Sequence, residues 1–263
     1  MSAESNNTAQ TIPSREGKSL SKGDRPPKPK QLNSIDIAVK SWLDGLPEEL
    51  LDTIMLNLDT LSSTTPKRWT VYPPMVLLPS GSLNSPQWSK ILSSISSSQK
   101  DSLWTLILQE ITRREGKGML THLAINSGIP LNKTTLEEED GENENILRTP
   151  SGLIMLYGYF GPDLSPNHEP SVDDFEDAFW VSTKQNGITQ VWAPRYTMFS
   201  RGNIKEKARL LDFHSQKRTG EGNVSKEEVS KCVAVDLYAG IGYFVFSYVA
   251  MGIERVVGWE LNP

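Results

Sequence analysis

The 263-residue sequence is poor in the residues that several kinds of protein need, and these shortages exclude classes of function. With a single cysteine, the chain has no disulfide framework. Its three histidines are scattered, without cysteines or paired carboxylates at ligand spacing, so we expect no metal site. No apolar stretch approaches the ~20 residues of a membrane span, and the N-terminus lacks a signal peptide's hydrophobic region. These absences favour a cytoplasmic protein without a membrane segment.

The sequence also lacks an excess of positive charge. Its 27 Lys and Arg residues face 32 Asp and Glu residues, for a formal net charge of −5. This sum looks unsuited to a nucleic-acid partner, but the distribution of charge matters more. Acidic residues gather at 137–144, which we interpret as a solvated loop. The basic clusters are candidates for phosphate contacts, although each alone is more often a solubilising charge: Lys67 with Arg68; Arg113 with Arg114 and Lys117; Arg195 with Arg201; Lys205, Lys207 and Arg209.

Composition and periodicity divide the chain into three regions. Residues 1–33 are rich in Ser, Asn, Lys and Pro, cannot bury enough apolar surface to fold, and are predicted to be a disordered tail. Residues 34–172 are predicted to form an α+β region with helices near 46–58 and 102–114 and a strand near 76–78. Taken alone, this region has no feature beyond those of a structural domain.

The third region, residues 173–263, begins with a predicted β-hairpin. Its strands, 178–183 and 188–192, flank the dipeptide Asn186-Gly187, whose tolerance of positive φ suits a type I′ turn. We expect residues 195–200 to form a further strand that leads into a helix.

Three polar residues mark the start of that helix. Asn203 and Glu206 stand three residues apart, as in a variant of the capping box, and Ser200 precedes them. Two interpretations stay open for these residues, helix capping alone or a contribution to a ligand site. The two are compatible, because a helix N-terminus offers backbone donors to an anion.

The most informative segment is a β-α-β pattern at the end of the chain. An apolar run at 232–237 leads into a small-residue turn at 239–242, and an apolar helix then continues to Gly252. A second buried strand at 255–260 ends on Glu260. Such folds bind the two hydroxyls of a ribose with an acidic residue about 20 positions after the glycine turn. Glu260 is therefore the candidate ribose ligand.

The turn itself indicates which cofactor would bind. Gly240 and Gly242 permit positive φ and close approach of a ligand, although a tight turn without a ligand explains them as well. The third glycine of the dinucleotide fingerprint is missing, which disfavours a pyrophosphate. Asp236 before the turn would repel a phosphate but suits an ammonium group or a ribose. These features favour S-adenosylmethionine.

Two segments carry a resemblance to a known family. Asp236-Leu-Tyr-Ala-Gly-Ile-Gly-Tyr-Phe244 and Met198-Phe-Ser-Arg-Gly-Asn-Ile-Lys-Glu-Lys-Ala-Arg209 resemble the tRNA wybutosine-synthesizing protein 2 family, which is similar to the tRNA guanine-37 N1-methyltransferases. Blocks at 66–79, 121–127 and 179–187 extend the resemblance over about 46–263. The resemblance implies an α/β chain: a Rossmann-like class I methyltransferase fold, truncated after its second strand and preceded by an α+β region that contacts tRNA.

The resemblance also implies a site. Ser200 and Lys207 lie where the family binds S-adenosylmethionine, and a lysine there could pair with the methionyl carboxylate of the cofactor. The sequence does not identify a catalytic base. We expect eight residues to bind the cofactor: Ser200, Asn203, Lys207, Asp236, Tyr238, Gly240, Gly242 and Glu260.

The activity implied is transfer of the 3-amino-3-carboxypropyl group of S-adenosylmethionine to carbon 7 of 4-demethylwyosine at position 37 of phenylalanine tRNA. One alternative is a guanine-37 N1-methyltransferase, although Ser200-Arg-Gly-Asn203 favours the wybutosine branch. Another is a truncated, non-catalytic product that retains a tRNA-contacting region. With two strands of a doubly wound sheet, apolar surface around Val233, Val235 and Val257 would lack cover, so we expect weak cofactor binding.

Overall fold

The computed structural model describes residues 32–54, 58–126, 152–164, 169–197, 199, 202–212 and 225–260. The acidic segment at 137–144 and all but the last two residues of the predicted tail lie outside the described residues. Contacts within the chain group residues Asn33–Pro263 into one unit, separate from Met1–Leu32.

The first elements of this unit are three helices. The side chain of Asn33 accepts a hydrogen bond from the backbone N–H of Ile35 and so caps the first of them. The single helix predicted near 46–58 corresponds to the second helix and the start of the third, on either side of residues 55–57. The three helices are α1 (Ser34–Asp44), α2 (Glu48–Ile54) and α3 (Leu58–Thr64).

A four-stranded sheet follows, with the strand order β1-β2-β3-β4. Its outer pairs are antiparallel, whereas β2 and β3 are parallel and are joined through two helices. The predicted strand near 76–78 and helix near 102–114 are confirmed, and the helix starts earlier because Ser96 and Gln99 form a capping box. The elements are β1 (Thr70–Tyr72), β2 (Met75–Leu78), α4 (Pro86–Ser94), α5 (Ser97–Glu115), β3 (His122–Asn126) and β4 (Leu153–Tyr157).

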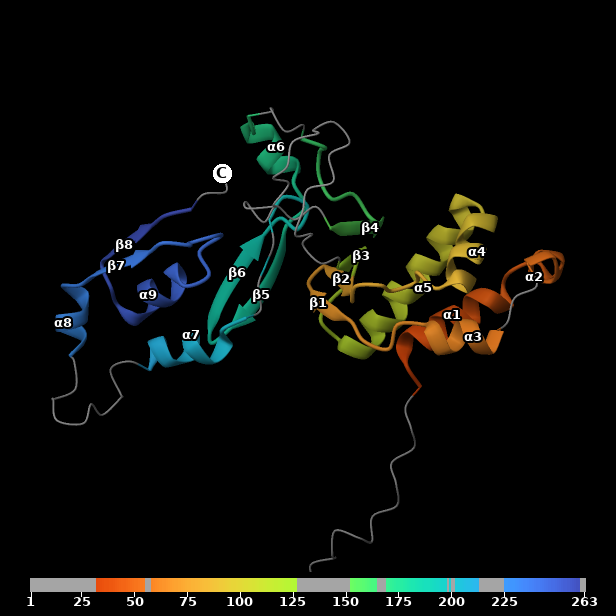
Figure 1. The fold of residues 1–263 in the computed structure, drawn as a ribbon, viewed down its shortest axis with the longest axis horizontal. Helices are drawn as coiled ribbons and strands as arrows, with labels where there is room; N and C mark the ends of the chain where they lie inside the picture. Colours follow the sequence, from red (N-terminus) through yellow and green to blue (C-terminus); the bar gives the residue numbers. More distant parts are fainter. Residues whose placement is uncertain are drawn as a thin grey trace, which may run out of the picture. The chain divides into compact units, whose positions relative to one another are not determined.

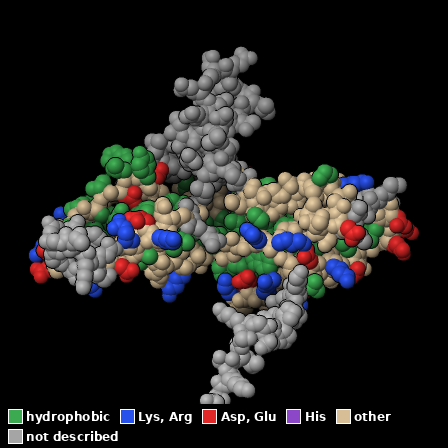
Figure 2. Space-filling model, turned by 60° about the horizontal axis from the view of Figure 1, so that its bottom comes forward, with side chains coloured by type: hydrophobic (Ala, Val, Ile, Leu, Met, Phe, Trp, Pro, Cys, Tyr) green, Lys and Arg blue, Asp and Glu red, His purple; other side chains and the backbone are tan. Residues whose placement is uncertain are grey.

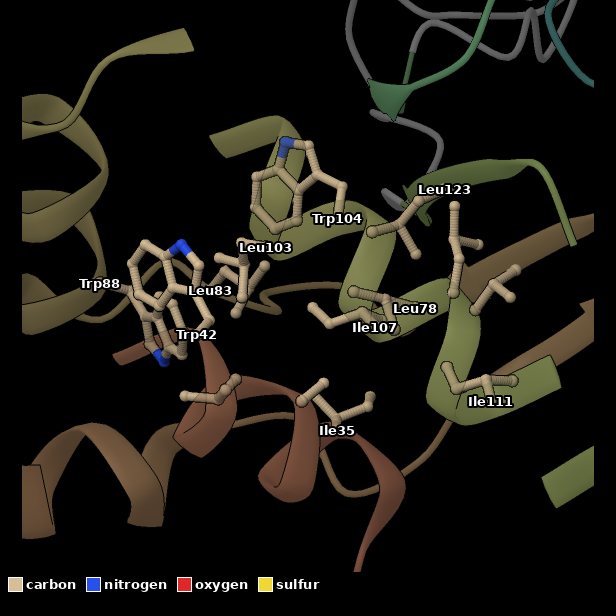
Figure 3. Packing of buried hydrophobic residues seen from close by; sticks show 14 of the residues in the cluster. Ile35, Trp42, Leu78, Leu83, Trp88, Leu103, Trp104, Ile107, Ile111 and Leu123 are labelled. Carbon is tan, nitrogen blue, oxygen red and sulfur yellow. The ribbon is translucent and has the colours of Figure 1, made fainter. Parts of the chain in front are cut away.

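The main core lies between these helices and one face of the sheet. Side chains from α1, α5, β2 and β3 meet there, as Figure 3 shows for Ile35, Leu103, Ile107, Leu78 and Leu123. All five are fully buried. Burying one such side chain contributes roughly 1.5–3 kcal/mol, so this cluster is the main apolar contribution to stability among the described residues.

The predicted hairpin is present and packs against a second, smaller core. Asn186 and Gly187 both have positive φ, 50° and 84°, which agrees with the predicted type I′ turn. Trp192 and Val181 of the hairpin pack with Tyr72 of β1. The elements are α6 (Val172–Asp177), β5 (Val181–Gln185) and β6 (Ile188–Trp192).

The strand predicted at 195–200 is wrong for the residues that the structure describes. The carbonyl of Ala193 accepts hydrogen bonds from the backbone N–H groups of Tyr196 and Thr197, at 3.1 and 3.0 Å. These bonds close a turn directly after β6, so the chain reverses where the sequence pattern predicted an extended segment.

The β-α-β pattern at the end of the chain is confirmed. Strands β7 and β8 lie side by side in Figure 1 and are parallel, with Asp236 opposite Gly258. Gly252 ends the helix between them in the left-handed conformation. As expected, apolar side chains of this sheet are exposed, including Val233 at 55% and Val235 at 58%. The elements are α7 (Ile204–Leu211), α8 (Lys226–Ser230), β7 (Val233–Asp236), α9 (Val245–Met251) and β8 (Arg255–Gly258).

The described residues therefore form a mixed α/β structure. Among them, no helix combines the length and the apolar character needed to cross a bilayer.

Candidate functional site

The turn after β7 has the backbone conformation that its glycines predict. Gly240 and Gly242 have φ values of 52° and 89°. A Cβ at either position would lie 2.7 Å from a ring atom, of Tyr243 in the first case and of Phe246 in the second. Glycine is therefore favoured at both positions by its backbone conformation, and a side chain there would also have to displace a ring.

The end of β8 is hydrogen-bonded to this turn. The backbone N–H of Gly240 donates to Oε2 of Glu260 at 2.7 Å. Two backbone bonds hold Trp259 beside the turn, from Ala239 N to Trp259 O at 3.0 Å and from Trp259 N to Asp236 O at 2.7 Å. The structure thus brings together the glycine turn and the acidic residue that the sequence placed about 20 positions later.

Asp236 lies at the start of the same turn. Its Oδ1 accepts a hydrogen bond from the backbone N–H of Tyr238 at 3.3 Å. Its Oδ2 is buried and has no hydrogen-bond partner among the described residues. The ring of Tyr238 is 87% exposed and lies at the surface of the turn. A buried carboxylate oxygen without a donor is costly, so Asp236 is suited to a ligand that brings a donor or a positive charge.

Lys207 of α7 is buried among aromatic rings. Its side chain is 4% exposed, and its Nζ has no hydrogen-bond partner among the described residues. The Nζ lies 6.0, 5.5 and 5.8 Å from the ring centroids of Phe199, Tyr243 and Phe244. The rings attract the ammonium through cation–π interactions but do not replace its hydration. Burial therefore lowers the pKa of Lys207.

The packing of α7 connects Lys207 with the glycine turn. Tyr243 and Phe244 follow directly after Gly242, and α7 packs against α9. On α9, burial raises the pKa of Tyr248, and the carboxylates of Asp236 and Glu206 contribute to this rise. Residues of both predicted segments, around 203–207 and 236–244, therefore meet at α9.

The predicted capping box at the start of α7 is wrong. Asn203 occupies the N-cap position with a φ of 59°, and its side chain makes no capping hydrogen bond. Capping side chains usually belong to residues in extended conformation, which directs their oxygen at the first turn, and Asn203 is left-handed. Glu206 instead pairs with Arg209, which lowers the pKa of the Glu206 carboxyl. Ser200 lies outside the described residues.

Sequence reasoning missed the aromatic enclosure of Lys207. A usable signal was present, because Leu210 and Leu211 follow Lys207 at the helical spacing of three and four residues, which places the lysine on the apolar face of α7. The enclosing rings could not be read from the sequence, because Phe199, Tyr243 and Phe244 come from separate segments.

Five of the ten basic residues that were candidates for phosphate contacts pair with carboxylates among the described residues. On the face drawn in Figure 2, Lys and Arg side chains are interspersed with Asp and Glu. Arg114 lies over the ring of Trp69 instead. Within the described residues there is no group of three or more His, Cys, Asp or Glu side chains placed to hold a metal ion. The pairs are Lys67 with Asp36, Arg113 with Glu110, Lys117 with Glu115, Arg195 with Asp163 and Arg209 with Glu206.

Comparisons with known proteins agree on one family. No family model matches the chain. The tRNA wybutosine-synthesizing protein 2 of Schizosaccharomyces pombe is 40% identical over 199 residues, which are 75% of this chain and 40% of that protein. The protein of the same name from Saccharomyces cerevisiae is 34% identical over 253 residues, which are 89% of this chain and 48% of that protein. The chain thus spans about half the length, or less, of the curated relatives it matches.

A solved structure is similar at a lower level. The crystal structure of P. horikoshii TYW2 in complex with MeSAdo aligns with 87% of this chain and 54% of that chain, at 17% identity and a TM-score of 0.44. This likeness is too low to support an inference about fold or function. The sequence matches to the two yeast proteins instead confirm the resemblance, and the chain is a relative of the tRNA wybutosine-synthesizing protein 2 family over the part of those proteins that it spans.

Proposed function

We propose that the chain belongs to an enzyme that transfers the 3-amino-3-carboxypropyl group of S-adenosylmethionine to carbon 7 of 4-demethylwyosine at position 37 of phenylalanine tRNA. The observation that carries this proposal is the 40% identity over 199 residues to a tRNA wybutosine-synthesizing protein 2. The geometry of the turn supports it, because Glu260, Asp236 and the two turn glycines lie together as a nucleoside site requires.

We assign the segment from β7 to β8 to the opening of a Rossmann-like class I methyltransferase fold. In this assignment residues 173–263 carry the hairpin and the start of the cofactor domain, and residues 34–172 contact the tRNA. The enzyme acts in the cytoplasm, where tRNA is available.

Each part of the cofactor has a candidate partner. Glu260 accepts hydrogen bonds from the ribose hydroxyls, since the bond from the N–H of Gly240 to its Oε2 holds this carboxylate beside the glycine turn. Asp236 pairs with the ammonium group, and Lys207 pairs with the carboxylate. Because the Nζ of Lys207 is buried, the carboxylate reaches it only if the side chain extends or the rings of Tyr243 and Phe244 shift. The proposed set is completed by Tyr238, Ser200 and Asn203. We assign no individual role to these three residues.

Orientation of the cofactor selects the reaction. The sulfonium makes all three attached carbons electrophilic, and the carbon that faces the acceptor reacts. In the proposed reaction the bond between sulfur and the carboxypropyl chain breaks, and sulfur keeps the electron pair and leaves as methylthioadenosine. Carbon 7 of the base forms the new carbon–carbon bond and loses a proton. We assign no side chain to the removal of that proton.

Two labelled cofactors test this proposal. The chain is incubated with tRNA containing 4-demethylwyosine and with S-adenosylmethionine labelled either in the methyl group or in the carboxypropyl group. We expect label in the tRNA from the carboxypropyl group alone, with methylthioadenosine as the product. Label from the methyl group alone would identify a methyltransferase. Transfer of neither label, with the tRNA still bound, would identify a non-catalytic binding protein.

A further inference from the structure

A cleft lies beside the glycine turn, apart from the contacts of Lys207 and Glu260. Its volume is 360 Å³, within the range of roughly 300–1,000 Å³ that is usual for sites of small organic ligands. It lies between α6, the β5–β6 hairpin and the turn that follows β6. Its lining is mainly apolar and includes four aromatic side chains: Phe175, Trp180, Trp192 and Tyr196.

Hydrogen bonds hold two of these rings in place. The indole N–H of Trp180 donates to the carbonyl of Phe175 at 3.1 Å, and the two rings lie 4.7 Å apart at an angle of 58°. The hydroxyl of Tyr196 donates to the carbonyl of Pro162 at 2.6 Å. The neighbouring Gly161 has a φ of +100°, and a Cβ there would lie 2.6 Å from the Tyr196 hydroxyl. The cleft thus has rings in fixed positions before any ligand enters.

The cleft also shares a wall with the candidate cofactor site. Ile241, the residue between the two turn glycines, lines the cleft and packs against the cluster that contains Trp192. Asp174 and Thr197 are the polar residues of the lining. A flat molecule held by the aromatic side chains would therefore lie next to the turn that approaches the cofactor.

From this arrangement we propose that the cleft binds an unstacked purine-type base, the acceptor base of the RNA substrate. The proposal rests on the proposed function, because the cofactor must lie at the glycine turn for the two ligands to meet. Stacking on aromatic side chains is the usual means by which proteins hold a single base out of its helix. Phe175, 64% exposed, leaves the cleft open on one side, as a base that remains attached to its strand requires.

The adenine of S-adenosylmethionine has the same flat aromatic chemistry, so the test must separate the two ligands. The probe is 1,N2-ethenoguanosine, a tricyclic purine nucleoside, titrated by equilibrium dialysis with and without saturating S-adenosylmethionine. We expect the probe to bind equally well in both conditions. Displacement by S-adenosylmethionine would assign the cleft to the adenine and overturn the proposal.

Variants of Trp180 test the stacking. Trp180→Leu keeps an apolar side chain but removes the ring, and we expect it to weaken probe binding about tenfold or more. Trp180→Phe retains a ring and is expected to lose less. The matched control is Tyr159→Leu, which removes an exposed aromatic ring outside the cleft lining and should leave binding unchanged. Circular dichroism verifies folding, and if Trp180→Leu unfolds, Phe175→Leu takes its place.

The outcomes distinguish a failure of the cleft assignment from a failure of the proposed function. No binding of the probe, or an equal loss in the Tyr159 control, overturns the cleft assignment even if the carboxypropyl label is transferred. Probe binding that depends on Trp180 supports the assignment even if neither label is transferred to the tRNA, a result that would overturn the proposed function instead.

Discussion

Two regions of the described chain differ in how far their apolar side chains are buried. Around α5 the core residues Leu103 and Ile107 are fully buried, whereas Val233 and Val235 of β7 are more than half exposed. The proposed cofactor contacts lie in the second region, around the turn after β7. Regions with few buried contacts open at low free-energy cost, and binding elements are often drawn from them. The main core and the proposed cofactor contacts therefore lie in different parts of the chain.

The largest effect expected from this comparison is on stability. Ile107→Ala creates a cavity in the main core and should lower the free energy of unfolding by about 2–5 kcal/mol. Val235→Ala removes a side chain that is 58% exposed and should cost about 1 kcal/mol or less. Urea denaturation of the two variants measures both changes. Equal losses would show that β7 is as much a part of the core as α5.

The next effect concerns the ribose. Glu260→Gln removes the charge that we propose to hold the ribose hydroxyls, and should weaken binding of methylthioadenosine about tenfold, since hydrogen bonds to charged groups contribute roughly 1.5–3 kcal/mol. Calorimetry with methylthioadenosine isolates this contact because the ligand has no carboxylate. Glu254→Gln, an exposed carboxylate before β8, is the matched control. Unchanged affinity in Glu260→Gln would contradict the ribose assignment.

A smaller effect is the pH dependence of cofactor binding. Burial lowers the pKa of Lys207 in the free protein, and a bound carboxylate would raise this pKa again. Between the two pKa values binding takes up a proton, so the affinity for S-adenosylmethionine should fall as pH rises, by at most about tenfold per pH unit. Methylthioadenosine, which has no carboxylate, should not show this dependence on Lys207. An equal slope for both ligands would exclude Lys207 as its source.

The smallest effect that we expect is a pH dependence of stability caused by His122 of β3. Burial lowers the pKa of His122, against the raising effect of its hydrogen bond with the carbonyl of Tyr159. Between this lowered pKa and the unfolded value near 6.5, the unfolded chain binds more protons, so stability is lost as pH falls through that window. The slope should stay well below the limit of about 1.4 kcal/mol per pH unit, because the ring is only partly buried. Urea denaturation of the chain and of His122→Gln from pH 5 to 8 measures how the free energy of unfolding depends on pH. An identical dependence in the variant would contradict the assignment of this effect to His122.

Local signals in the sequence were sufficient for the elements around the site. The dipeptide at 186–187 predicted the hairpin, and the glycines of the turn with the acidic residue after the second strand predicted the β-α-β unit. Each of these features depends on the backbone preferences of a few neighbouring residues. Glycine and asparagine tolerate positive φ in any context, so their positions carry over from sequence to structure.

The features that the sequence missed depend on distant contacts or on competing local bonds. The turn closed by the Ala193 carbonyl replaced the strand predicted at 195–200. The left-handed backbone of Asn203 prevented the predicted cap. The enclosure of Lys207 brings together a helix, a loop residue and the glycine turn, and no spacing in the sequence indicates that meeting.

The most direct test of the proposed cofactor site compares two lysines of α7. Lys207 is buried among the aromatic rings, whereas Lys205, two residues earlier, is exposed. Calorimetry measures the binding of S-adenosylmethionine to the unchanged chain, to Lys207→Met and to Lys205→Met. The titrations extend to millimolar ligand, because we expect the affinity to be weaker than micromolar. We expect Lys207→Met to weaken binding at least tenfold without loss of stability, and Lys205→Met to bind as the unchanged chain does. Equal binding by both variants would contradict the proposed pairing of Lys207 with the carboxylate of the cofactor.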